Sequence, residues 1–125
     1  MEILRGINMT NKFGAKKTIY KGVVYDSKWE AKRAYELDML QRAGKITDLE
    51  HQKRFILQEG YVNNKGQKVR PISYIADFTY RAKSGQLYCE DTKSPATKTE
   101  LYRVKKKMFE YKYPEYLFIE TFSKV

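Results

Sequence analysis

Apolar residues recur every three to four positions in two segments of the chain and at every second position in several others. The first spacing is typical of a helix with one buried face, and the second of a half-buried strand. Helices are therefore predicted at residues 27–43 and 99–113. Strands are predicted at residues 46–58, 72–81, 87–93 and 116–122. This order of helix, three strands, helix and strand predicts an α/β fold in which one sheet packs against two helices.

The first predicted helix has signals at both ends. Ser27 and Glu30 form the S-x-x-E pattern of a capping box, and Gly44 follows as a C-cap. At 100° per residue, one face collects the apolar side chains Trp29, Ala31, Ala34, Leu37 and Leu40. Glu30 lies on this apolar face, an unusual place for a carboxylate. Two interpretations stay open: Glu30 closes the capping box, or it is a functional carboxylate aimed at the sheet.

The second predicted helix begins near Thr99 and ends before Pro114, because the residue preceding a proline disfavours helical backbone. Its predicted buried stripe consists of Leu101, Val104, Met108 and, at its end, Tyr111. Three segments lie outside the long elements. We expect a basic flexible arm at 1–17, a short β-hairpin at 18–25 and a polar turn at 62–70.

The charge of the chain points to a polyanionic partner. Its 125 residues, enough for one domain with a single core, include 25 Lys and Arg against 15 Asp and Glu, a net charge of +10. Nucleic acid is therefore favoured over the alternative of a basic protein without such a partner. No membrane association is expected, because no apolar run approaches about 20 residues and no helix pairs a basic face with exposed Trp, Phe and Leu. The N-terminus also lacks the apolar core of a signal peptide.

Two residue types that dominate protein chemistry are nearly absent. Cys89 is the single cysteine and His51 the single histidine, so a zinc cluster of about four Cys and His ligands is excluded. A Ser-His-Asp triad would have to use His51, which has no nucleophile signature near it. Any metal ligands must therefore be oxygen atoms, which favours Mg²⁺ or Mn²⁺.

Strand alternation suggests where such oxygen ligands gather. In 72–81, alternation assigns Ser73, Ile75, Asp77 and Thr79 to one face, and Ile72, Tyr74, Ala76, Phe78 and Tyr80 to the other. In 87–93, Asp91 and Lys93 share a face, and Glu90 points away. A hairpin would bring Asp77, Asp91 and Lys93 to one edge. Two adjacent carboxylates resist joint ionisation unless a cation neutralises them, and a divalent metal would also polarise a phosphoryl oxygen.

These residues carry a family resemblance. A glutamate from a helix followed by D-(x13)-D-x-K on consecutive strands resembles the PD-(D/E)XK nuclease superfamily, and in particular short phage-encoded proteins described as Holliday-junction resolvases or left uncharacterised. The shared patterns are Asp26-Ser27-Lys28-Trp29-Glu30, Gly44-Lys45-Ile46-x-x-Leu49-x-x-Gln52, Tyr74-Ile75-Ala76-Asp77-Phe78, Glu90-Asp91-Thr92-Lys93, Tyr102-Arg103-x-Lys105 and Tyr111-Lys112-Tyr113-Pro114. Ala76 departs from the proline in the family's name, a position that many members also vary.

The resemblance implies a restriction-endonuclease-like core and a set of site residues. Glu30, Asp77 and Asp91 would bind Mg²⁺ or Mn²⁺, with Thr92 at the metal site and Lys93 as the catalytic lysine. Glu90 is a second acidic candidate beside Asp91, and Gln52 matches a recurring glutamine of the family that could support the site. DNA binding is assigned to the basic residues Lys16, Lys17, Lys53, Arg54, Lys98, Arg103, Lys105 and Lys106. Each of these cations has the alternative of an ordinary solvated surface residue.

The function expected from this resemblance is metal-dependent cleavage of four-way DNA junctions in the cytoplasm of an infected bacterium. Two symmetric cuts in a junction predict a homodimer with two active sites, and the segment before Ser27 is the expected dimer contact. Two rival functions stay open. One is another phage nuclease that acts on flaps, single strands or duplexes. The other is a non-catalytic DNA-binding accessory protein with the same fold.

Overall fold

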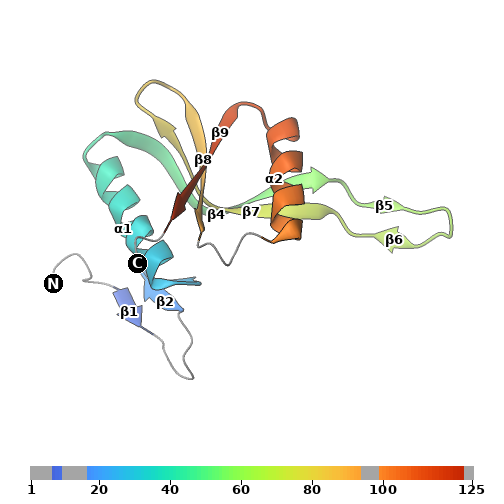
Figure 1. The fold of residues 1–125 in the computed structure, drawn as a ribbon, viewed down its shortest axis with the longest axis horizontal. Helices are drawn as coiled ribbons and strands as arrows, with labels where there is room; N and C mark the ends of the chain where they lie inside the picture. Colours follow the sequence, from blue (N-terminus) through green and yellow to red (C-terminus); the bar gives the residue numbers. More distant parts are fainter. Residues whose placement is uncertain (1–6, 10–16, 94–98, 123–125) are drawn as a thin grey trace.

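The computed structural model describes residues 7–9, 17–93 and 99–122. Its main sheet is mixed and is flanked by two helices (Figure 1). The sheet strands are β4 (Ile46–Gln58), β7 (Ile72–Ala82), β8 (Leu87–Lys93) and β9 (Tyr116–Phe122), and the helices are α1 (Lys28–Arg42) and α2 (Glu100–Lys112). The predicted order of helix, three strands, helix and strand is confirmed for these long elements. None of the helices in the described ranges is long and apolar enough to cross a membrane.

The sheet has the order β4-β7-β8-β9. β4, β7 and β8 form an antiparallel meander, and the β7–β8 turn uses Gly85 at a φ of 97°. β9 runs parallel to β8, and a parallel neighbour needs a crossover connection, which α2 provides. The last strand therefore returns to the edge beside β8, which carries the D-x-K sequence.

The two helices cover opposite faces of the sheet. Consecutive residues of a strand point to opposite faces, and two neighbours in β8 identify the helix on each side. Cys89 packs in a core cluster with Phe109 of α2, and Glu90 binds Arg33 of α1. α1 thus lies over one face of β8 and α2 over the other.

The predicted alternation along 72–81 is wrong, because β7 changes face at Asp77. Tyr74 and Ala76 pack in the cluster of α2, whereas Phe78 and Tyr80 pack in the cluster of α1. Unbroken alternation would have put all four on the same face. The change of face makes Asp77 the point at which both helices meet β7.

β4 changes face at the same level. Leu49 packs against the α1 cluster, whereas Phe55 and Leu57 belong to the α2 cluster. Between them lies Gln52, with a φ of 55°, in the left-handed region that non-glycine residues rarely adopt. The register pairs His51 with Phe78 and Lys53 with Ala76, so Gln52 lies opposite Asp77. Such strain, which costs about 1–3 kcal/mol, persists when the surroundings require it.

The predicted buried stripe of α2 is wrong at three of its four positions, and only Met108 packs against the core. Leu101 is 63% exposed, Val104 48% and Tyr111 91%, while the buried residues of the helix are Tyr102 and Phe109. The two aromatic rings bury more area than the aliphatic side chains, and the half-buried Lys106 extends over the ring of Phe118 at 5.2 Å. The helix is therefore rotated from the predicted orientation, and Leu101 and Val104 face solvent.

The N-terminal hairpin is confirmed as β2 (Thr18–Tyr20) and β3 (Val23–Tyr25). Its turn places Lys21 and Gly22 at φ values of 51° and 78°, as a two-residue hairpin turn requires. Three short strands were not predicted. β1 (Ile7–Met9) lies within the expected arm at 1–17 and pairs with β2. β5 (Tyr61–Val62) and β6 (Lys68–Val69) pair with each other at the two ends of the expected turn at 62–70. Each has only two or three residues, too few for a periodic signal.

Candidate active site

Glu30 lies in the first turn of α1, on the buried face. The Ser27 hydroxyl accepts a hydrogen bond from the Glu30 amide at 3.0 Å, which caps the helix start. Among the hydrogen bonds of the described residues, the reciprocal bond from the Ser27 amide to the Glu30 carboxylate does not occur. Glu30 is only 6% exposed, so its carboxylate is placed in the interior without serving as a cap.

Asp77 and Asp91 meet across β7 and β8. The Asp77 amide donates to Asp91 Oδ1 at 3.2 Å. Asp77 Oδ2 in turn accepts two hydrogen bonds from Thr92, one from the amide and one from the hydroxyl, each at 2.8 Å. The change of face at Asp77 frees its side chain from the regular alternation and lets it reach Thr92. Three of the predicted site residues are thus joined in one hydrogen-bonded group.

Lys93 supplies the positive charge of this group. Its Nζ lies 3.3 Å from Asp91 Oδ2 and 3.8 Å from the centroid of the Tyr102 ring, and its side chain is only 15% exposed. Tyr102 is itself held by a short hydrogen bond from its hydroxyl to Glu120. The ammonium is therefore positioned between a carboxylate of β8 and an aromatic face of α2, an arrangement that strengthens where water is excluded.

Burial and neighbouring carboxylates raise the pKa values of Glu30 and Asp77. Burial, followed by the charges of Asp77, Asp26 and Asp91, raises the pKa of Glu30 from its ordinary 4.5 to about 8. Burial and the charge of Asp91 raise the pKa of Asp77 from 3.8 to about 6, against the opposing effect of the Thr92 hydrogen bonds. Lys93 lowers both pKa values but does not offset the burial. The buried Glu30 and Asp91 and the half-buried Asp77 thus share one lysine and favour a further cation.

Glu90 has a different environment. Arg33 of α1 contacts its two carboxylate oxygens through Nε at 2.5 Å and Nη2 at 3.0 Å. The hydroxyls of Tyr80 and Thr121 donate to the same carboxylate at 2.8 and 3.0 Å. Glu90 is completely buried, and four hydrogen bonds occupy its oxygens. Of the two acidic candidates, Asp91 is the one that lies with Asp77 and Lys93, and Glu90 joins α1 to the sheet.

The raised pKa values predict that the metal-free protein loses stability as pH rises. A carboxyl whose pKa is higher in the folded state than in the unfolded state binds more protons in the folded state. Its contribution to the free energy of unfolding is therefore fully present below the unfolded-state pKa near 4. That contribution is lost as pH rises through about 6 for Asp77 and about 8 for Glu30. In EDTA, we expect the free energy of unfolding to fall by on the order of 3 kcal/mol between pH 5 and 8. Urea titrations at several pH values measure this.

Glu30→Gln is the matched test of this prediction, since the amide is similar in size and cannot ionise. We expect the variant to lose most of the pH dependence, and 10 mM Mn²⁺ to restore the stability of the wild-type protein at pH 8. A stability that stays constant or rises over this pH range in EDTA would contradict the raised pKa values.

The chemistry of these residues fits a hard divalent cation, although their present geometry does not. Asp77, Asp91 and Glu30 offer only oxygen ligands, as Mg²⁺ and Mn²⁺ prefer. In the part of the chain that the structure describes, no three His, Cys, Asp or Glu side chains stand close enough to hold a metal ion as they are. Lys93 instead neutralises Asp91, so a bound cation would take over that role.

The family described as "Protein of unknown function (DUF1064)" matches residues 10–122. The chain belongs to this family. Comparisons with curated proteins and with solved structures give no match. The matched range includes the candidate site from Glu30 to Lys93, and the family has no stated activity. The function of this DUF1064 chain must therefore be argued from the site itself.

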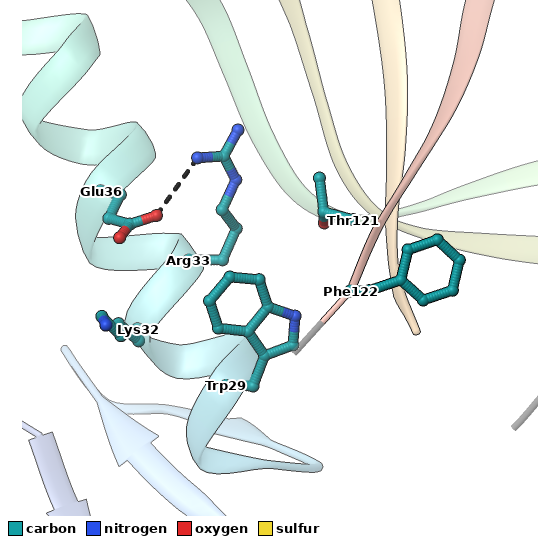
Figure 2. A pocket seen from close by; sticks show the side chains of 6 residues that line it. All are labelled: Trp29, Lys32, Arg33, Glu36, Thr121 and Phe122. Atoms are coloured by element: carbon teal, nitrogen blue, oxygen red, sulfur yellow. Dashed lines mark hydrogen bonds and ion pairs between the residues drawn. The ribbon is translucent and has the colours of Figure 1, made fainter. Parts of the chain in front are cut away.

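A pocket of about 320 Å³ opens between α1 and β9, lined by side chains of both elements. Figure 2 shows that Trp29 and Arg33 extend from α1 toward Thr121 and Phe122 of β9, and Lys32 also lines the pocket. Trp29 directly precedes Glu30, and its indole N–H is buried with no hydrogen-bond partner. The pocket is thus lined by the Trp29 indole and by cationic side chains of α1, the helix that carries Glu30.

The predicted DNA-binding residues are spread over several surfaces. Lys53 pairs with Glu50 at 3.3 Å, and Arg54 donates to Ser73 at 3.0 Å on the exposed part of β4. In the N-terminal segment, Lys17 pairs with Asp26. On α2, Arg103 is exposed, and Lys105 and Lys106 are half-buried. Lys16 and Lys98 lie outside the described residues. They do not form one continuous patch among the described residues.

Two residues of the site were missed by sequence reasoning. Tyr102, which lies under Lys93, was hidden by the wrong assignment of the α2 stripe. Arg33, which binds Glu90, falls on α1 between polar residues and resembles any surface arginine. Gln52 was included as a supporting residue, and the structure places it opposite Asp77 with its side-chain amide 3.3 Å from the Val24 carbonyl.

Proposed function

We propose that this chain is a metal-dependent DNA endonuclease with a restriction-endonuclease-like core of the PD-(D/E)XK type. Its preferred substrate is branched DNA, the four-way junction foremost. One observation carries the proposal: Asp77 and Asp91 meet on neighbouring strands, with the Lys93 ammonium 3.3 Å from Asp91 and the buried Glu30 close enough for both aspartates to raise its pKa. The order α1, β4, β7, β8, α2, β9 supports the proposed relation to the PD-(D/E)XK nucleases.

The chemistry is phosphodiester hydrolysis. Glu30, Asp77 and Asp91 would hold Mg²⁺ or Mn²⁺, which supplies charge neutralisation and acidifies water when bound. Thr92 fixes the Asp77 carboxylate through its two hydrogen bonds. As the water oxygen attacks phosphorus and one P–O ester bond breaks, Lys93 donates hydrogen bonds to the phosphoryl oxygens, on which negative charge develops. The attacking water gives up one proton to solvent, and the leaving oxygen takes one proton from solvent.

Branched DNA and a homodimer belong to the same proposal. Resolution of a four-way junction needs two symmetric cuts, and a two-fold dimer provides two equivalent sites. The β1–β2–β3 sheet is the proposed dimer contact, because it is separate from the main sheet and precedes α1 in the chain. The net charge of +10 supports a nucleic acid as partner.

The proposal is tested by incubating the purified protein with four-way junctions, flaps, duplexes and single strands in Mg²⁺ or Mn²⁺. We expect cleavage of the junction to be fastest and EDTA to stop it. Lys93→Met should slow the junction reaction at least about 100-fold, because one charged donor to the transition state is lost. Lys83→Met, an exposed lysine in the β7–β8 turn, is the matched control and should cleave like the wild-type protein.

Each other outcome has a definite meaning. Faster cleavage of flaps or single strands than of junctions assigns the chain to another class of DNA-processing nuclease. Tight junction binding with no cleavage in either metal overturns the nuclease proposal in favour of a DNA-binding accessory protein.

A further inference from the structure

Residues 58–72 form an arm that projects from the body of the protein. β4 and β7 continue beyond the region covered by the helices, and the chain then forms the β5–β6 ribbon, which lies apart from both helices (Figure 1). Each side of the arm spans about seven residues, which corresponds to about 20 Å of extended chain. β5 and β6 pair only with each other within the described ranges. We call residues 58–72 the basic arm.

The tip of the basic arm is held by its own hydrogen bonds. The Asn63 side chain accepts from the amides of Lys65 and Gln67 at 3.0 Å each and donates to the Gln67 side chain at 2.9 Å. The Asn63 amide donates to the Gln67 carbonyl at 2.9 Å. An isolated two-stranded ribbon is at best marginally stable in water, so these bonds order a segment that has no core of its own.

The surface of the basic arm combines cations with apolar side chains. Lys65, Lys68 and Arg70 are exposed, and Glu59 is the only acidic residue in the range, so three positive charges less one negative leave +2. The exposed apolar residues of β5 add to this surface: Tyr61 is 51% exposed and Val62 is 62% exposed. This combination matches a polyanion that also offers apolar contacts, as the grooves of DNA do.

The basic arm is continuous with the candidate site. Between them lies the part of the sheet just beyond Asp77, where Arg54 pairs in register with Ile75. Ile75 is 50% exposed, and Arg54 is also exposed, so neither helix covers this surface. A ligand lying on Arg54 and Ile75 would reach Asp77 at one end and the basic arm at the other.

We infer that the basic arm binds double-stranded DNA beside the cleavage point, with Lys65, Lys68 and Arg70 on phosphates and the ribbon in a groove. This inference rests on the proposed function and deepens it, because it names a duplex segment as the part of the substrate that the arm recognises. The major groove of DNA, about 12 Å wide and 8.5 Å deep, admits a two-stranded ribbon. A chain with net charge +10 meets duplex phosphates with complementary charge.

The experiment compares two triple variants in equilibrium binding to a four-way junction, a linear duplex and a single strand, all in EDTA. Lys65→Ala/Lys68→Ala/Arg70→Ala removes the cations of the basic arm. Its matched control removes three exposed cations outside the arm by the substitutions Arg42→Ala, Lys45→Ala and Lys83→Ala. We expect the arm variant to bind junction and duplex at least about tenfold more weakly, and its slope of log affinity against log salt to be smaller by about 3.

We expect the affinities of the control variant to stay within about threefold of those of the wild-type protein. The arm variant should keep most of its affinity for the single strand. Equal losses in the two triple variants would overturn the inference. Light scattering tests the alternative that the basic arm binds a second copy of the chain. A wild-type dimer that becomes a monomer only in the arm variant would assign the arm to self-association instead. Because binding is measured without metal, a wild-type protein that binds but never cleaves contradicts the nuclease proposal and leaves the arm result readable.

Discussion

Asp77→Asn is expected to reduce the rate of junction cleavage at least about 10³-fold and to leave junction affinity within about twofold. The amide keeps the size of the side chain and an oxygen that can accept the Thr92 hydrogen bonds, but it removes one negative charge from the group formed with Asp91 and Glu30. Single-turnover cleavage with excess protein measures the rate, and fluorescence anisotropy in EDTA measures the affinity.

The control for this substitution is Asp48→Asn, which removes an exposed carboxylate paired with Arg81 on the same sheet. We expect it to cleave at the wild-type rate. Without metal, Asp77→Asn should also be at least as stable as the wild-type protein, since repulsion from Asp91 is relieved. Equal cleavage by the two variants would remove Asp77 from the active site, whereas a destabilised Asp77→Asn protein would show that the charge has a structural role.

Arg33→Met is expected to lower the free energy of unfolding by about 3–5 kcal/mol, the largest stability effect that we predict. The substitution leaves the completely buried Glu90 without the guanidinium that binds both of its oxygens. Tyr80 and Thr121 still donate to the carboxylate, but neither carries a compensating charge. Urea unfolding at pH 7, followed by circular dichroism, measures the loss.

The matched control is Arg81→Met, because Arg81 forms an exposed ion pair with Asp48 at 3.2 Å. Exposed pairs contribute at most about 1 kcal/mol, so the control should unfold close to the wild-type protein. The double variant Arg33→Met/Glu90→Leu removes both buried charges and should regain much of the stability. If Arg33→Met and Arg81→Met lower the free energy of unfolding by the same amount, the ion pair between Arg33 of α1 and Glu90 of β8 does not stabilise the packing of the helix on the sheet.

The part of the site that could be predicted from sequence is the part that depends on local patterns. Glu30 was placed on the buried face of α1 by helical periodicity, and its 6% exposure confirms the placement. Asp91 and Glu90 were assigned to opposite faces of β8 by alternation, and their partners confirm that assignment. These inferences hold because a regular helix or strand fixes the direction of each side chain relative to its neighbours.

The inferences that were wrong concern departures from regularity or choices between similar surfaces. The change of face at Asp77 lies opposite Gln52, a residue of the neighbouring strand with a left-handed backbone, and no pattern within 72–81 reveals it. The orientation of α2 was decided by the burial of Tyr102 and Phe109 against β8 and β9, which the helical spacing of aliphatic residues does not encode. In each case the decisive contact joins segments that are distant in the chain.

The sequence by itself therefore determined the order and limits of the long elements, the basic charge and the residues Glu30, Asp77, Asp91 and Lys93 as a candidate set. Periodicity and residue chemistry are local properties, which is why they can be read without coordinates. Only the tertiary structure decided that Glu90 is occupied by Arg33, that Lys93 rests on Tyr102 and that residues 58–72 project beyond the helices. Those features arise from pairings between distant segments, and such pairings are fixed by the packing of the whole domain.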